Sequence, residues 1–199
     1  AEDQGEEGAG PAPRLRPTCV HAPADLAQVL RRVFAASDAR KVQSMCWWFA
    51  ARGNLEEPVL HTIAVFDHEV SGDSTALTAA GQEQFVNFLR GNPDLVPIGW
   101  AVYHRSDMSG TPTLGELREH WRHVGHCPTE MILVTCWKRG KELEDGYALR
   151  VIQPLMMEHL DSRDGDVNSA MFMARDFMEP VPCILDGGGE VAVRRVGAL

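Results

Sequence analysis

The sequence has no long hydrophobic run and no excess of positive charge, and each absence excludes a class of protein. Its longest apolar runs, such as MILVTCW, are far shorter than the roughly 20 residues of a membrane-spanning helix. The formal net charge is −9, which is the wrong sign for a protein that binds mainly phosphate backbones or anionic lipid surfaces. We therefore expect no membrane association and no dominant direct contact with nucleic acid.

The cysteines also lack the pattern of a disulfide framework or a zinc knuckle. Their number is odd and no two are spaced as CxxC; they are Cys19, Cys46, Cys127, Cys136 and Cys183. Cysteines of this kind are typically reduced and mostly buried thiols. We therefore expect an intracellular, reducing compartment, either cytoplasm or nucleus. Because the sequence starts without Met, a presequence removed on import into an organelle is compatible with it.

The 199 residues, of which 44% are hydrophobic and 24% charged, predict one domain with one substantial core. The chain begins with AEDQGEEGAGPAPRLRP, which has too few apolar side chains to offset the entropy of ordering. We expect residues 1–20 to form a disordered or extended acidic tail. Residues 21–199 then form the domain, which closes with short helical pieces and a hairpin.

Hydrophobic periodicity predicts helices mixed with strands along this domain. Helical spacing marks PADLAQVLRRVFAASDA, TAAGQEQFVNFLRGNPD and TLGELREHWRHVG, and less strongly QPLMMEHL and VNSAMFMARDFM. Thr78 is a possible helix cap, and Thr113 and Glu116 have the spacing of a capping box. Methionines concentrate in the two late segments, where they suit either core filling or a surface that repacks on a partner.

Short β-branched and aromatic runs predict the strands. VQSMCWWFA and PVLHTIAVF are expected to pair, and VPIGWAVYH, EMILVTCW and GYALRVI follow them, with EMILVTCW central. PVPCILDGGGEVAVRRV is expected to form a terminal hairpin. Trp47 and Trp48 are adjacent in a strand, so one is expected to face the core and the other solvent or a partner. The sequence thus predicts an α/β (α+β) domain with a mixed sheet flanked by helices.

The order of helix, paired strands, helix, IGW strand, loop, helix and apolar strand resembles the MPN (JAB1/Mov34) family. The resemblance covers most of residues 21–137 and depends on the pattern PIGWAVYH, TPTLGELREHW and MILVTC. Active members of this family are the JAMM zinc isopeptidases. The resemblance implies that a strand ending in His-x-His, an Asp at the start of the next helix and a Glu from an early strand would form a zinc site.

Carried over position by position, the resemblance implies a degenerate motif. The first metal His falls on Val102 and the second on His104, while Thr113 takes the place of a Ser, Glu116 that of the Asp and Gln43 that of the catalytic Glu. Valine has no lone pair to offer a metal, and glutamine cannot accept a proton near neutral pH. Glu116 could bind zinc, but its longer side chain and shifted register would displace the ligand oxygen. We therefore expect no metal and no cofactor at this position.

Other conspicuous residues have two interpretations each. His104 is either a lone ligand or a strand-end histidine with local partners, and we favour the second. His120, His123 and Cys127 share a helical face and could reach a metal, although Gly125 is expected to end the helix before Cys127. Asp67, His68 and Glu69 are ligand types in a row, but neighbours in a strand point to opposite faces, so a solvated strand end is expected. Cys46 and Cys136 lie inside apolar strands, where a thiol is usually inert.

These observations lead to a noncatalytic MPN-like domain that acts as a protein-binding or architectural subunit of a larger assembly, including ribonucleoprotein assemblies. Its expected partners are other protein subunits, among them another MPN-domain protein. The first alternative is a divergent JAMM-type zinc isopeptidase or deubiquitinase that uses His104, Glu116 and one further ligand. The second is an unrelated α/β enzyme that uses the His-Cys helix of His120, His123 and Cys127.

Overall fold

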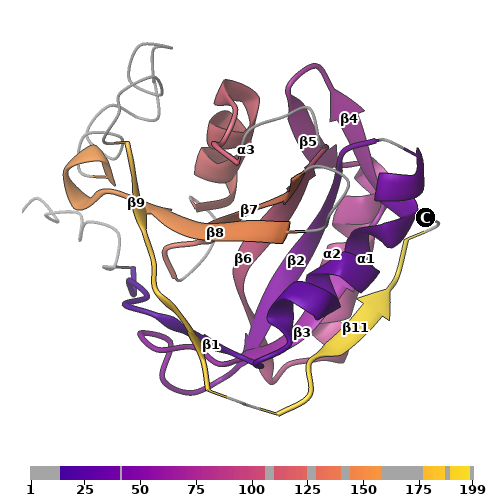
Figure 1. Ribbon diagram of the computed structural model, residues 1–199. Coiled ribbons are helices and arrows are strands. Elements are labelled where there is room, and N and C mark those ends of the chain that lie inside the picture. Colours follow the sequence, from indigo (N-terminus) through magenta and orange to yellow (C-terminus); the bar gives the residue numbers. More distant parts are fainter. Residues whose placement is uncertain are drawn as a thin grey trace, which may run out of the picture.

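A seven-stranded mixed sheet organises the domain (Figure 1). The computed structural model describes residues 14–40, 42–105, 110–124, 129–139, 144–157, 177–186 and 189–197. In sheet order the strands are β11 (Ala192–Arg195), β3 (Leu60–Val65), β2 (Ser44–Ala51), β6 (Leu95–His104), β7 (Ile132–Arg139), β8 (Glu144–Ile152) and β9 (Met178–Pro180). Neighbours are antiparallel except for the β11–β3 and β6–β7 pairs. The expected mixed sheet flanked by helices is confirmed.

The first helix, α1 (Leu26–Arg40), covers one face of the sheet. Leu26, Val29, Leu30 and Val33, which defined its helical spacing, are all buried. They belong to one core cluster with alternate residues of the strands, among them Trp48. Because these apolar residues recur every three or four positions, one stripe of the helix contacts the sheet and the other faces solvent.

The opposite face carries α2 (Ala79–Gly91) and α3 (Leu114–Val124). Trp47 is buried in this second cluster, so the adjacent tryptophans do point to opposite faces. The expectation that one of them is exposed is wrong, because helices cover both faces and both rings are buried. Thr78 caps α2 as predicted, since its hydroxyl accepts the Gly81 N–H at 3.1 Å.

Two short pairings lie outside the large sheet. β4 (His68–Ser71) and β5 (Ser74–Leu77) form a hairpin whose turn includes Gly72 at a φ of 60°, a value that favours glycine. β1 (Val20–Ala22) pairs in parallel with β10 (Cys183–Leu185). The strand β10 therefore does not pair with β11, and the predicted terminal hairpin is wrong.

The predicted hairpin does not form because β10 and β11 each pair with the edge of another strand. β10 pairs with the N-terminal strand β1, and β11 joins the large sheet beside β3. Each late strand therefore pairs with a segment from the first third of the chain, and residue spacing along the sequence cannot reveal such partners. The helix predicted over residues 167–178 is also wrong at its end, because Met178 begins β9; residues 167–176 lie outside the described ranges.

The N-terminal segment lies along the domain from Arg14 onward. Arg16 forms ion pairs with Glu130 at 2.8 Å and Glu179 at 2.6 Å, and its guanidinium also donates to the Ile152 carbonyl at 2.7 Å. Cys19 is buried. Residues 14–20, part of the predicted tail, thus run in contact with the domain, while residues 1–13 lie outside the described ranges.

Among the helices of the described residues, none combines the length and the apolar character needed to cross a lipid bilayer.

The strands β6 and β2, which share the longest antiparallel register, lie in the interior of the sheet. β7 is one position away from the centre, next to β6. The end of β6 therefore brings His104 to the interior of the domain, where α3 begins.

We predict that Gly99→Ala destabilises the domain by about 1–3 kcal/mol, because a Cβ there would lie 2.6 Å from the Ile132 carbonyl oxygen on β7. The matched control is Gly91→Ala at the end of α2, where a Cβ meets nothing within 4 Å. Urea denaturation of both variants tests this. Equal stability of Gly99→Ala and the wild type would contradict the close approach of β6 and β7.

Candidate functional site

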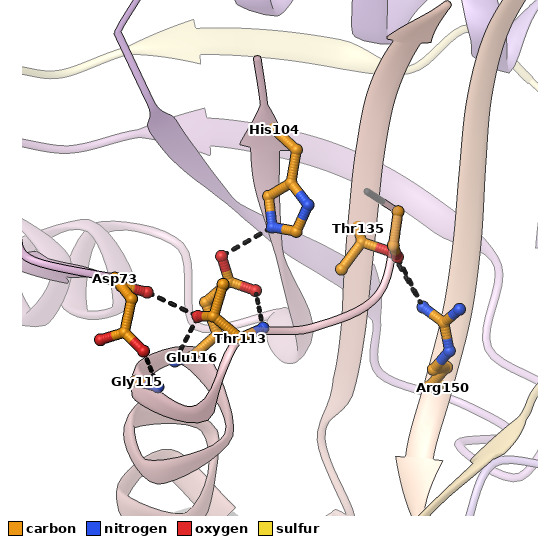
Figure 2. Close-up of polar contacts among 8 residues, drawn as sticks. Asp73, His104, Thr113, Gly115, Glu116, Thr135 and Arg150 are labelled. Carbon is orange, nitrogen blue, oxygen red and sulfur yellow. Dashed lines mark hydrogen bonds and ion pairs between the residues drawn. The ribbon is translucent and has the colours of Figure 1, made fainter. Parts of the chain in front are cut away.

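The residues at the degenerate motif positions meet where β6 ends and α3 begins. The His104 Nε2 and a Glu116 carboxylate oxygen are 2.7 Å apart, and neither side chain has any exposed surface (Figure 2). His104 closes β6, and Glu116 is in the first turn of α3. The sequence analysis treated His104 as a residue with local partners, and this contact with Glu116 confirms that interpretation.

The start of α3 shows why Glu116 points inward. The Thr113 N–H donates to Glu116 Oε2 at 3.0 Å, and the Glu116 N–H donates to the Thr113 hydroxyl at 3.1 Å. This reciprocal pair confirms the predicted capping box. The negative carboxylate also lies at the helix N-terminus, where the helix dipole stabilises negative charge. Both oxygens of Glu116 therefore have partners, one in His104 and one in the backbone.

The β4–β5 turn completes this cap. The Asp73 carboxylate accepts the Gly115 N–H at 3.0 Å, and the Thr113 hydroxyl donates to the Asp73 carbonyl (Figure 2). A Cβ on Gly115 would collide with the Asp73 carboxylate, so a larger residue there would displace this side chain from the cap. The sequence analysis missed Asp73, because 40 residues separate it from Thr113 and no local pattern connects them.

Val102 lies two residues before His104 and is fully buried. Its Cα pairs with Met45 on β2 and with Thr135 on β7, so it sits in the interior of the sheet. It belongs to the core cluster under α3, together with Leu117. The position that the resemblance assigns to a metal-binding imidazole is therefore a packed hydrophobic side chain.

Gln43 reaches the same end of the sheet. It is 8% exposed and immediately precedes Ser44, the first residue of β2, whose Cα pairs with Tyr103 on β6. The antiparallel register thus brings the backbone of Gln43 level with His104.

The chain between β6 and α3 returns to the site at Gly110, after residues 106–109, which lie outside the described ranges. The Gly110 carbonyl accepts from the Thr135 hydroxyl at 2.6 Å and from the Arg150 guanidinium at 3.2 Å. Arg150 also donates to the Thr135 hydroxyl at 2.9 Å (Figure 2). Partial burial lowers the pKa of Arg150. These hydrogen bonds from β7 and β8 hold Gly110, and with it the short segment that leads to Thr113. No sequence pattern marked Arg150.

The predicted helix cluster is only partly described. The Trp100 indole N–H donates to His120 Nδ1 at 2.9 Å, so this nitrogen carries no proton and has a partner. Burial, followed by the nearby His123, lowers the pKa of His120 to about 3. His123 lies 3.5 Å from a Glu119 oxygen, and Cys127 is outside the described residues. His120 is therefore a neutral core histidine that fixes Trp100.

The cysteine and acidic candidates have structural partners. Burial raises the pKa of Cys46 to about 12, which leaves its thiol protonated and unreactive. Asp67 follows β3 and is half-buried, because its carboxylate accepts from the Gln84 side-chain amide at 2.8 Å and its N–H donates to the Gln84 side-chain oxygen at 2.9 Å. Glu69, on β4, is exposed to solvent as expected. The His68 Nδ1–H donates to the Phe66 carbonyl at 2.8 Å.

One cluster was missed by the sequence analysis. Cys19, His21 and Glu57 bring three metal-ligating atoms to within 4.8 Å of one another. Cys19 and His21 alternate along an extended segment, which is a weak signal, but Glu57 follows 36 residues later and nothing local associates it with them. This cluster lies at β1 and is separate from the His104–Glu116 pair.

No protein-family model matches the chain, and a comparison with curated protein sequences finds no match. The chemistry must therefore be judged from the donor atoms themselves. A catalytic zinc uses three protein ligands. At the motif positions, Val102 offers no donor, and both oxygens of Glu116 are already hydrogen-bonded, to His104 and to the Thr113 N–H. These residues do not fit a zinc ion, and we derive no hydrolytic step from them.

We predict strong energetic coupling between His104 and Glu116. His104→Ala should cost about 3–5 kcal/mol, because it leaves a buried carboxylate without its partner. The double variant His104→Ala, Glu116→Ala should then lose less than the sum of the two single variants, by more than about 1 kcal/mol. Chemical denaturation of the four proteins measures this cycle. Additive losses would show that the two side chains do not depend on each other.

We predict that His120 makes the domain sensitive to acid. Its pKa is about 3 in the folded protein, against about 6.5 for an unfolded chain, so between these values the unfolded state binds more protons. The contribution of the neutral His120 to the free energy of unfolding is therefore complete above pH 6.5 and decreases as the pH falls. From pH 7 to pH 5 the wild type should lose about 2 kcal/mol more than His120→Gln, which keeps an acceptor for Trp100. Parallel pH dependences of the two proteins would contradict this.

Proposed function

We propose that the chain is a noncatalytic MPN-like domain that binds other protein subunits in a larger assembly. The observation that carries this proposal is the closed His104–Glu116 pair, which engages at 2.7 Å the two side chains that the resemblance assigns to metal binding. A buried and mutually paired imidazole and carboxylate stabilise a specific packing of α3 on β6. They do so with atoms that a hydrolase would direct toward a metal and a substrate.

The surface of α2 supports the protein-binding part of the proposal. In this helix only Gly81 is fully buried, while Phe85, Phe88 and Leu89 are half-buried and Val86 is 44% exposed. A helix that leaves its aromatic side chains partly exposed has apolar surface to offer a partner.

A groove of about 620 Å³ lies beside this helix. Apolar side chains of α2 line one side, including Phe85 and Val86, and Pro97 of β6 contributes to its wall. Its polar end is formed by the C-terminal part of α3, where Arg122 and Glu119 form an ion pair at 3.0 Å. An apolar wall with a polar rim is the usual anatomy of a protein interface.

The expected occupant is an apolar segment of another protein subunit, a second MPN-like domain included. The net charge of −9 favours protein over nucleic acid as the direct contact. We also propose a reducing intracellular compartment, which is supported by Cys19 and Cys46, both buried and neither in a disulfide. Ribonucleoprotein assemblies remain among the larger particles in which such a subunit would serve.

The alternative is a divergent JAMM-type isopeptidase. In its favour, His104 and Glu116 do lie side by side at the expected end of the strand. Against it, the position of the first metal histidine is the buried Val102, and the place of the general base is held by an amide, Gln43. A hydrolase would need both functions from residues outside the motif. An enzyme based on His120 is disfavoured by the Trp100 bond to its Nδ1.

We predict that Val86→Glu removes the partner from the groove while leaving the domain folded, because this side chain is already 44% exposed. The matched control is Val70→Glu, a substitution of a 46% exposed valine on β4 that is not part of the groove. Affinity purification with quantitative mass spectrometry should show partners that Val70→Glu retains and Val86→Glu loses by tenfold or more. Equal recovery by both variants would contradict the groove as interface.

The same preparations test the absence of hydrolase activity. Wild-type protein supplied with zinc should leave ubiquitin chains of several linkages intact. Cleavage that disappears in His104→Ala, in a variant whose folding is verified by circular dichroism, would contradict the noncatalytic proposal and establish the isopeptidase alternative.

A further inference from the structure

Three side chains with metal-binding atoms converge at the start of the domain. The Cys19 sulfur lies 3.6 Å from His21 Nε2 and 3.4 Å from a Glu57 oxygen, and this oxygen is 3.8 Å from His21 Nε2. Cys19 and His21 alternate along the segment that leads into β1, so their side chains point to the same side. Glu57 comes from the connection between β2 and β3.

The backbone holds Glu57 opposite these two residues. The Thr18 N–H donates to the Glu56 carbonyl at 2.7 Å, and the His21 N–H donates to the Pro58 carbonyl at 2.9 Å. Glu57 lies between these two anchored carbonyls. Its placement therefore follows from main-chain bonds and does not depend on contacts of its own flexible side chain.

The triangle of donor atoms has the size that zinc requires. With Zn–S of about 2.3 Å and Zn–N and Zn–O of about 2.0–2.1 Å, tetrahedral angles place the ligand atoms roughly 3.3–3.6 Å apart. The three separations in this cluster are 3.6, 3.4 and 3.8 Å. A small rotation of the Glu57 side chain, which is 51% exposed, closes the longest edge.

A second carboxylate orients the histidine. His21 Nδ1 lies 2.7 Å from an Asp186 oxygen, so Nδ1 carries the proton and donates it to Asp186. The lone pair of Nε2 is then directed toward Cys19 and Glu57. Asp186 follows β10, which pairs with β1, and a carboxylate behind a histidine ligand is the common outer partner in zinc sites.

We propose that Cys19, His21 and Glu57 bind a Zn²⁺ ion whose fourth position is open to water. A thiolate and an imidazole favour zinc over Mg²⁺ or Ca²⁺, which prefer oxygen ligands alone. The ion binds residues of β1 and of the β2–β3 connection, and through Asp186 it fixes β10. Zinc therefore fastens the N-terminal segment to the domain.

A cysteine nucleophile is the other chemistry that this cluster suggests, because Cys19 contacts one ring nitrogen of His21 and Asp186 contacts the other. The surroundings oppose it. Burial, and then Glu57, raise the pKa of the Cys19 thiol, so without a cation the thiolate is disfavoured. A divalent cation would compensate the negative charge that Glu57 and Cys19 bring together.

Zinc content and cobalt spectroscopy of the full chain test this site. After treatment with a chelator and reloading, the wild type should hold one zinc per chain by plasma mass spectrometry, and Co²⁺ should give a thiolate-to-cobalt charge-transfer band. Glu57→Gln should lose this binding, whereas Glu56→Gln, the adjacent acid, should retain it. Asp186→Asn should weaken zinc binding by about 10- to 100-fold. Cys19→Ser should lose the cobalt band and Cys183→Ser should keep it.

Thermal denaturation distinguishes a variant that has lost zinc binding from one that is misfolded. Zinc should raise the melting temperature of the wild type and of Glu56→Gln but not that of Glu57→Gln, whose exposed position leaves the apo fold unchanged. The absence of stoichiometric zinc, or zinc binding that survives both Cys19→Ser and Glu57→Gln, would overturn the proposal. A zinc ion lost in His104→Ala, and retained in Cys19→Ser, would contradict both this proposal and the noncatalytic function.

Discussion

The buried contact between His104 and Glu116 is the constraint on which the candidate site depends. It joins the last residue of β6 to the first turn of α3, and the capping box and the β4–β5 turn hold the same turn from outside. An imidazole and a carboxylate without solvent exposure must remain paired, because either alone would be costly in the interior. The geometry of strand and helix is therefore fixed by the same atoms that a metal would need.

Because of this contact, the residues of the candidate site have structural roles in the domain. The motif positions stabilise packing: Val102 fills the core, Glu116 caps a helix and Thr113 bonds the backbone. The proposed function and the proposed zinc site therefore involve other surfaces, the half-buried face of α2 and the Cys19, His21 and Glu57 cluster.

Local patterns predicted much of this fold. The apolar stripe of Leu26, Val29 and Leu30 and the cap at Thr78 identified α1 and α2, because helices depend on contacts within a few residues. The pairing of β10 with β1 and of β11 with β3 could not be predicted from the sequence. Strands far apart in the chain pair where a strand edge has no neighbour, and no local pattern shows which edge that is. The exposure expected for one tryptophan was wrong because both sheet faces are covered.

The candidate site likewise contains features that local sequence patterns predicted and features that they did not. The capping box of Thr113 and Glu116 was readable from its spacing. The resemblance assigned His104 and Glu116 to one motif, but the direct contact between them was not predicted. Asp73 and Arg150 were not predicted either, because they reach the site from a distant turn and strand. The cluster proposed to bind zinc was missed for the same reason, since Glu57 and Asp186 join Cys19 and His21 only in the folded chain.

Anomalous diffraction at the zinc absorption edge, from crystals grown with zinc, tests the central claim most directly. The account predicts no anomalous peak between His104 and Glu116, whose side chains should remain in direct contact near 2.7 Å. A peak at about 2.0–2.2 Å from both a His104 nitrogen and a Glu116 oxygen would contradict it, because the pair would then be a metal site.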